Sequence, residues 1–176
     1  MENSDKNKKT GMFPPALNYG ILTAVGLIIL SILIYFANLF EHNWISYIGY
    51  LILLSGIILG TKHYRDEYSG GFISYGRALG FGTFTAFIAA LVTGAFTYVF
   101  YQFLAPDALE TLRELAEIRV LEMNPNATDQ QLDMVRRLTS PLLMFFSGLF
   151  SYTFMGFIFS LVVAAFLKKK DPVDDL

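Results

Sequence analysis

Apolar residues of this chain are gathered into four long blocks that contain no Asp, Glu, Lys or Arg, and every charged residue lies outside them. The blocks cover residues 11–40, 42–61, 78–104 and 138–167. Each reaches the roughly 17–25 residues that a helix needs to cross about 30 Å of hydrocarbon. The pattern therefore predicts four transmembrane helices, near Ala16–Leu39, Trp44–Thr61, Tyr75–Phe103 and Pro141–Leu167.

The segment between the third and fourth blocks, residues 105–140, has the spacing of amphipathic helices. Pro106 and the acidic residue after it are typical of a helix start. Asn124-Pro125-Asn126 interrupts the pattern, and Thr128 with Gln131 predicts a capping box for a second helix. Apolar residues recur at helical spacing in the first stretch, at Leu109, Leu112, Leu115 and Ala116. We expect a helical hairpin that shields the outer helix ends; the alternative is a cap that binds a partner or gates a ligand.

The predicted fold class is an all-α integral membrane protein with four transmembrane helices and an amphipathic helical hairpin between the third and fourth. Tails at 1–15 and 168–176 flank a transmembrane domain at 16–167, which contains the hairpin at 105–140. Composition agrees, since 54% of residues are apolar and only 16% are charged, against about 25% charged in soluble domains. The first block is too long for a signal peptide, and no small-x-small cleavage site follows it, so we expect it to be retained.

Basic residues predict the orientation, because Lys and Arg in short flanking segments collect in the cytoplasm. Four crossings place both termini on one side, together with the loop from Lys62 to Ser74. That side carries nine basic residues and the other carries four: Lys6, Lys8, Lys9, Lys62, Arg65, Arg77, Lys168, Lys169 and Lys170 against Arg113, Arg119, Arg136 and Arg137. We expect a multi-pass membrane protein with both termini cytoplasmic.

Interfacial residues and catalytic chemistry add little to this picture. Trp44 is expected to anchor the outer interface, and Arg77 the inner one, where its guanidinium can reach lipid phosphate or Asp66 and Glu67. His42 and His63 lie on opposite sides of the predicted membrane and cannot share a metal site. The chain has no cysteine and a net charge of −2, and it contains no phosphate loop or nucleophile elbow. We expect no enzyme activity, cofactor, metal or nucleic-acid partner, only the lipid bilayer and a homo-oligomer or another membrane protein.

Small residues recur at four-residue spacing along the predicted helices. In membranes such residues let helix backbones approach closely. We assign helix packing to Gly56, Gly60, Ala78, Gly82, Ala86, Ala90, Gly94, Gly148, Gly156 and Ser160. This packing lies within one bundle or, alternatively, between copies of the chain. The bulky residues of the third helix are expected to face lipid: Phe81, Phe84, Phe87, Ile88, Leu91 and Tyr98.

Two sequence stretches carry a family resemblance. They are His63 to Gly82, with Gly71-Phe72-Ile73-Ser74-Tyr75-Gly76 followed by Ala78 and Gly80, and the last helix, which ends Gly156-Phe157-Ile158-Phe159-Ser160-Leu161 before Lys168-Lys169-Lys170. The chain is similar, from about Leu17 to Lys170, to the bacterial membrane proteins grouped as domain-of-unknown-function family 4199. The resemblance implies a four-helix inner-membrane protein, and it brings no activity, substrate or catalytic residue.

Two functions follow as hypotheses. The first is a structural or accessory component of the cell envelope. The second is a small oligomeric carrier or channel for an uncharged or small solute, with a polar path along Thr85, Thr93 and Thr97 of the third helix and Tyr152 of the fourth. The middle of every predicted helix lacks ionisable residues, which makes proton-coupled transport an unfavoured mechanism. A continuous wet cavity along the path would favour transport, and a dry, close-packed bundle would favour the accessory role.

Overall fold

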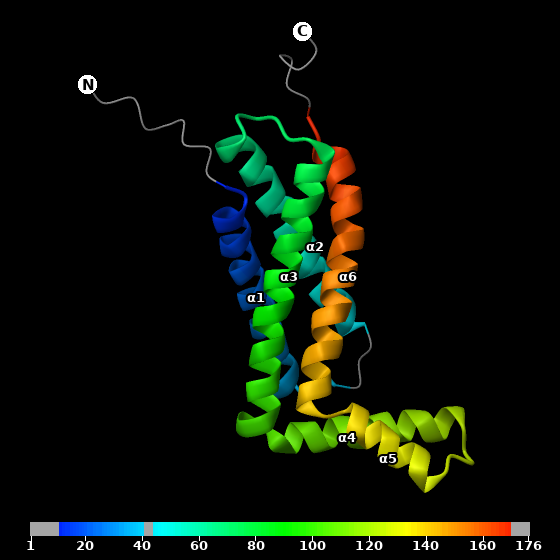
Figure 1. Cartoon of the computed structure of the whole chain (residues 1–176). Coiled ribbons are helices and arrows are strands. Elements are labelled where there is room, and N and C mark those ends of the chain that lie inside the picture. The colour runs from blue at the N-terminus through cyan, green and yellow to red at the C-terminus, as the bar shows by residue number, and fades with distance from the viewer. Residues whose placement is uncertain (1–10, 41–43, 170–176) are drawn as a thin grey trace.

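A computed structural model describes residues 11–40 and 44–169 of the chain. Four long helices form a bundle: α1 (Phe13–Phe36), α2 (Ile45–His63), α3 (Tyr75–Val99) and α6 (Pro141–Leu167) (Figure 1). Single π-helical turns extend two of these helices, η1 (Tyr64–Tyr68) after α2 and η2 (Phe100–Leu104) after α3. Two shorter helices, α4 (Pro106–Met123) and α5 (Asp129–Leu138), connect α3 to α6. We call the end where α1 begins and α6 ends the tail end, and the opposite end, which carries α4 and α5, the hairpin end.

The predicted all-helical class is confirmed across the described residues. Three helices are long and apolar enough to cross a membrane: α1, α3 together with η2, and α6. The sequence predicted four such helices. The remaining one, α2, has 19 residues, which extend about 28 Å at 1.5 Å per residue.

Helix α1 begins three residues earlier than predicted, at Phe13. Prolines occupy the first turn of this helix, where an absent backbone N–H removes no hydrogen bond. The helix ends at Phe36, and the chain then turns at Asn38, whose φ of 50° is left-handed. Glu41, His42 and Asn43, between the first two helices, lie outside the described residues, as do the basic residues of the two tails, Lys6, Lys8, Lys9 and Lys170.

Helix α3 lies at the centre of the bundle and packs against α6, α1 and α2. The expectation that Phe81 and Ile88 face lipid is wrong, because these side chains are only 0% and 8% exposed. Because α3 has neighbours on three sides, it buries more of its circumference than the half that carries the small residues. The Phe81 ring stacks on Tyr64 at a centroid distance of 4.8 Å and fills the space beside Gly60, where a side chain is absent.

The tail end of the bundle is closed by packed side chains and by the link between η1 and α3. Gly70 and Gly71, with φ of 65° and 86°, turn the chain after η1. Ile73 then forms an isolated antiparallel bridge with Lys169, in which both backbone N–H groups donate to the opposite carbonyl at 3.0 and 2.9 Å. Directly beneath lies a buried apolar cluster of Ala16, Tyr64, Ile73, Ala78, Phe81 and Ala164.

Helices α4 and α5 project sideways from the hairpin end (Figure 1). The first turns of α4 contact the bundle, where Ala108 and Leu109 are buried and the Tyr35 hydroxyl donates to Asp107 at 3.5 Å. The hairpin therefore covers helix ends of the bundle over its first turns, and its remainder projects away from the bundle (Figure 1). The predicted capping box of Thr128 with its third helical residue is present at the start of α5.

Candidate functional site

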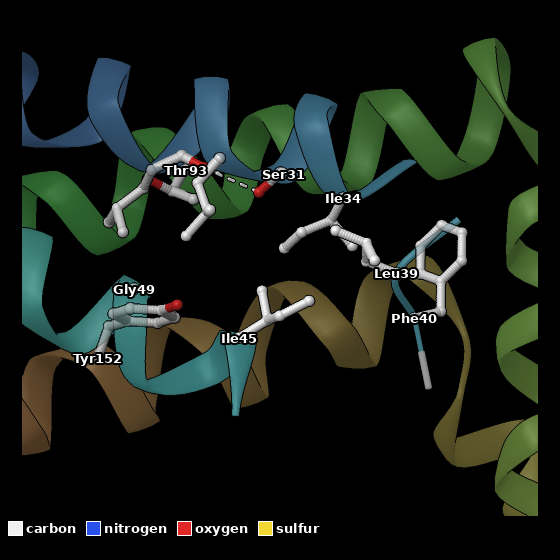
Figure 2. A pocket seen from close by; sticks show the side chains of 10 residues that line it. Ser31, Ile34, Leu39, Phe40, Ile45, Gly49, Thr93 and Tyr152 are labelled. Atoms are coloured by element: carbon white, nitrogen blue, oxygen red, sulfur yellow. Dashed lines mark hydrogen bonds between the residues drawn. The ribbon is translucent and has the colours of Figure 1, made fainter. Parts of the chain in front are cut away.

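Two neighbouring cavities lie in the half of the bundle nearer the hairpin end. They share two lining residues, Thr93 of α3 and Tyr152 of α6. The first cavity, of about 180 Å³, lies among α1, the α1–α2 connection, α2, α3 and α6, and its other lining residues are Leu27, Leu30, Ser31, Ile34, Leu39, Phe40, Ile45 and Gly49 (Figure 2). The second, of about 210 Å³, lies between α3 and α6 and is also lined by Ala90, Gly94, Thr97, Met144, Ser147 and Gly148.

The first cavity exists because α2 starts late and carries a glycine near its start. Figure 1 shows α2 beginning further from the hairpin end than the point where α1 stops. Leu39 and Phe40, in the connection, supply apolar side chains there in place of a helix. At Gly49 the missing side chain leaves room for Tyr152, whose hydroxyl oxygen lies 2.9 Å from where a Cβ would stand.

The second cavity has a different origin, the absence of side chains from two facing helices. A Cβ built on Gly148 of α6 would meet nothing within 4 Å, so α3 and α6 are not in close contact there. Ala90 and Gly94 on α3 add no bulk to fill the gap. One turn closer to the hairpin end the helices touch again, because a Cβ on Gly94 would lie 2.9 Å from the Phe145 ring.

Hydroxyl groups provide most of the side-chain polarity of the cavities. Three of them donate to carbonyls of their own helices: Ser31 to Leu27 at 2.9 Å, Thr97 to Thr93 at 2.9 Å and Ser147 to Met144 at 3.2 Å. The Thr93 hydroxyl is buried and, within the described residues, has no hydrogen-bond partner. Leaving a buried polar group unpaired costs about 1–3 kcal/mol. The Thr93 hydroxyl oxygen is itself buried and does not open onto either cavity.

The structure brings three of the four residues of the expected polar path to these cavities. Thr93 and Tyr152 line both, and Thr97 lines the second. Thr85 lines neither; it is fully buried nearer the tail end, where its hydroxyl has no partner among the described residues. The path is therefore interrupted between Thr93 and Thr85, two helical turns apart.

Close packing of α3 with its neighbours fills the space beyond Thr85. A Cβ on Gly82 would lie 2.5 Å from the Ser160 hydroxyl oxygen and 2.9 Å from Ile57, and one on Gly156 would overlap the Ala86 side chain. The Ser160 hydroxyl itself donates to the Gly156 carbonyl at 2.6 Å. Leu53, Ile57, Ala86, Ala89 and Val163 form a buried cluster in the same region.

The remaining residues assigned to helix packing lie at interfaces between bundle helices, with one exception. A Cβ on Gly56 would overlap Thr23 of α1, and one on Gly60 would lie 2.9 Å from the Tyr19 ring. Ala78 and Ala90 are buried on α3. The exception is Gly148, which lines the second cavity and makes no such approach within the chain.

The residues expected at the interfaces are exposed at opposite ends of the bundle. Trp44 precedes α2, and Arg77 lies in the first turn of α3. Asp66 is paired with Arg65, at 2.7 Å, and not with Arg77. The hydrogen bond from Arg65 lowers the pKa of the Asp66 carboxyl, with smaller contributions from the charges of Arg65, Lys62 and Lys169.

Sequence reasoning missed part of the lining and an aromatic cluster at the tail end. Ser31, Gly49 and Ser147 carry no sequence signal for a cavity, because serine and glycine also serve ordinary helix packing. His63 lies between Tyr19 and Tyr68, with ring centroids 5.6 and 5.8 Å away. These residues come from two helices and a π-helical turn, and only the fold brings them together.

The outward surface of the bundle is apolar, as expected of a protein surrounded by lipid. Large side chains on the sides of α1 and α6 are widely exposed, with Leu22 at 64% and Phe150 at 73%. Soluble monomers rarely expose such continuous apolar surface. With three helices of membrane-spanning length and composition among the described residues, the fold indicates a helical membrane protein.

The chain belongs to the family described as protein of unknown function (DUF4199), whose model matches residues 18–169. The match covers the bundle from α1 to the bridge at Lys169 and agrees with the family resemblance seen in the sequence. Searches of the curated proteins and of the solved structures found no match for the chain.

Proposed function

We propose that this protein is a structural or accessory component of the bacterial inner membrane that does not itself conduct solutes and has no enzyme activity. The observation that carries the proposal is the close packing of the bundle between Thr85 and the tail end. Both cavities stop before that region, and Gly82 and Gly156 hold α3 and its neighbours at distances that leave no room for a solute. A path across the membrane would require these helices to separate.

In the proposed topology α2 also crosses the membrane, which makes four crossings, and both termini are cytoplasmic. Support comes from the start of α1 and the end of α6, which lie at one end of the bundle (Figure 1), as an even number of crossings requires. Exposed basic residues also gather at that end, among them Lys62, Arg77 and Lys168.

The topology can be tested with single cysteines, because the natural chain has none. Ser69→Cys lies after η1 at the tail end, and Asn126→Cys lies between α4 and α5. In intact cells an impermeant thiol reagent should label Asn126→Cys alone, and both variants should react after the membrane is permeabilised. Labelling of Ser69→Cys alone would reverse the orientation, and labelling of both in intact cells would remove α3, the helix between the two sites, as a crossing.

The accessory role predicts an intact barrier. Purified protein is reconstituted into liposomes, and the cysteine labels report its orientation and its amount. These liposomes should give no flux of protons, ions or small uncharged solutes above that of empty vesicles. Isolation from native membranes should in addition recover a membrane protein at fixed stoichiometry. Solute flux in proportion to the amount of protein would contradict the role.

The second candidate is the small oligomeric carrier for an uncharged solute. The observation that favours it is that Thr93 and Tyr152 line both cavities, so movement of one side chain would join them. The liposome experiment separates the candidates. A carrier predicts saturable uptake of an uncharged solute that falls in Thr93→Val or Tyr152→Phe and persists in the control Tyr50→Phe, since Tyr50 contacts the Tyr152 ring at 5.6 Å and lines neither cavity.

A further inference from the structure

The hairpin of α4 and α5 begins and ends where the bundle helices leave the membrane. The membrane-spanning stretch of α3 and η2 runs to Leu104, and α4 begins at Pro106. Helix α5 ends at Leu138, and α6, which also has membrane-spanning length and composition, begins at Pro141. Because each residue of the chain reaches at most about 3.6 Å, these short links hold both helices at the membrane surface. The hairpin projects sideways from the bundle (Figure 1), and so it runs along that surface.

One side of α4 faces the end of the bundle, and this side is apolar except at Arg119. Ala108 and Leu109, where α4 contacts the bundle, are buried. With about 3.6 residues per turn, the same side passes through Leu112, Leu115, Ala116, Arg119 and Met123. The opposite side carries Glu110, Glu114, Glu117 and Leu121. Met123, at the far end of α4, is 80% exposed, so the apolar side extends beyond the part that the bundle covers.

Helix α5 lies beside α4 and runs in the opposite direction (Figure 1). Arg136 of α5 pairs with Glu117 of α4. The side of α5 that faces α4 therefore carries Leu132, Val135 and Arg136. Met134 and Leu138, one turn apart, lie outside that side and are 64% and 60% exposed. Since the direction of rotation reverses between antiparallel helices, Met134 and Leu138 lie on the same face of the hairpin as the apolar side of α4. The opposite face of α5 carries Asp129, Asp133 and Arg137.

The hairpin therefore has one apolar face, directed toward the membrane, and one charged face. The carboxylates lie on the charged face, whereas the guanidinium of Arg119, on the apolar face, can extend to lipid phosphate. Helices with this separation bury their apolar side about 5–10 Å deep, at the boundary between lipid headgroups and acyl chains. Exposed apolar residues also continue from Leu138 into the first turns of α6, at Leu142 and Phe146, so apolar surface runs from the hairpin to the side of the bundle that contacts lipid.

We propose that the α4–α5 hairpin is a membrane-surface anchor. It lies flat on the bilayer with Met123, Met134 and Leu138 at the boundary between headgroups and acyl chains, and with its carboxylates in water. Its partner is the lipid bilayer and not another protein. A pair of helices held in this way fixes the depth of the bundle at one membrane surface. The anchor goes beyond the accessory role, and it depends neither on that role nor on which leaflet carries the hairpin.

Fluorescence quenching of single labels tests which face of the hairpin meets lipid. The full chain, which has no natural cysteine, is placed at one copy per lipid nanodisc, and each variant carries one cysteine labelled with a small bimane fluorophore. Lipid brominated near the top of its acyl chains quenches from the membrane, and iodide quenches from water. Phe150→Cys, on the exposed side of α6, gives the quenching expected for full contact with lipid.

Two matched pairs compare the faces. On α4, Met123→Cys and Leu121→Cys both replace an exposed apolar residue, so the two labels differ in face and not in the character of the natural side chain. On α5, Met134→Cys is compared with its neighbour Asp133→Cys. Brominated lipid should quench the labels at positions 123 and 134 nearly as much as the label at position 150, and iodide should quench them little. The labels at positions 121 and 133 should show the reverse.

Three results would overturn the proposal: strong iodide quenching of all four labels, as expected of a face reserved for a protein that the disc lacks; the reverse of the expected pattern; or strong quenching of all four by brominated lipid. A second measurement changes the face itself. Met123→Glu places a carboxylate on the lipid side, where it is unfavourable, and should increase iodide quenching of the label in Met134→Cys. Leu121→Glu should leave that quenching unchanged, and equal effects of the two substitutions would count against the anchor.

Discussion

Replacing Gly156 with alanine adds a single methyl group at the closest approach of α3 and α6. The new Cβ would overlap the Ala86 side chain and lie 3.6 Å from the Ala86 Cα. Carbon atoms pack favourably at about 3.5–4.0 Å, so the two helices must separate. This pair forms the most extensive helix contact in the bundle, and a separation there weakens packing along both helices.

The expected magnitude follows from two opposing effects. Overpacking a well-packed interior costs about 1–3 kcal/mol, and alanine gains about 0.5–1 kcal/mol over glycine within a helix. Gly148→Ala, on the same helix, measures the second effect alone, because a Cβ there meets nothing within 4 Å. The difference in unfolding free energy between the two variants should therefore be about 1–3 kcal/mol, with Gly156→Ala the less stable.

Reversible unfolding in mixed micelles measures this difference, with helix content as the signal. The variant Ala86→Gly combined with Gly156→Ala moves the methyl group from α3 to α6. It should recover at least about 1 kcal/mol relative to the sum of the two single changes. Equal stability of Gly156→Ala and Gly148→Ala, or additivity in the double variant, would refute the close approach of α3 and α6.

Three further changes test local features. Arg65→Gln should raise the pKa of Asp66 toward its ordinary value in an NMR titration; because that pKa is lowered in the fold, the pair is intact at neutral pH and is lost as pH falls through it. Thr128→Ala should speed amide exchange across α5, since the loss of a capping residue costs about 0.5–2 kcal/mol of helix stability. Gly71→Ala should lower thermal stability by about 1–2 kcal/mol because its φ is 86°, whereas Gly76→Ala should not, as its φ is not positive and a Cβ there meets nothing.

The sequence by itself determined where the helices lie and which class of protein they make. The boundaries at Tyr75, Pro141 and Leu167 agree with the structure, because a long apolar block without charges can satisfy its backbone in lipid only as a helix. The capping box at Thr128 is likewise local, since its hydrogen bonds join residues three apart. Features that depend on neighbours in the chain can be read from the chain.

Only the tertiary structure decided how many neighbours each helix has. The pattern of small and bulky residues on α3 is a property of one helix, and it could not reveal that Phe81 and Ile88 are covered by the helices around it. In a membrane both lipid and protein surroundings are apolar, so hydrophobicity does not distinguish the two faces as it does in water. For the same reason the cavities could not be predicted from the sequence. Gly148 was assigned to helix packing, and Gly49 carried no sequence signal. The space beside them depends on where α2 begins and on how α3 and α6 approach, and side chains distant in the sequence determine both.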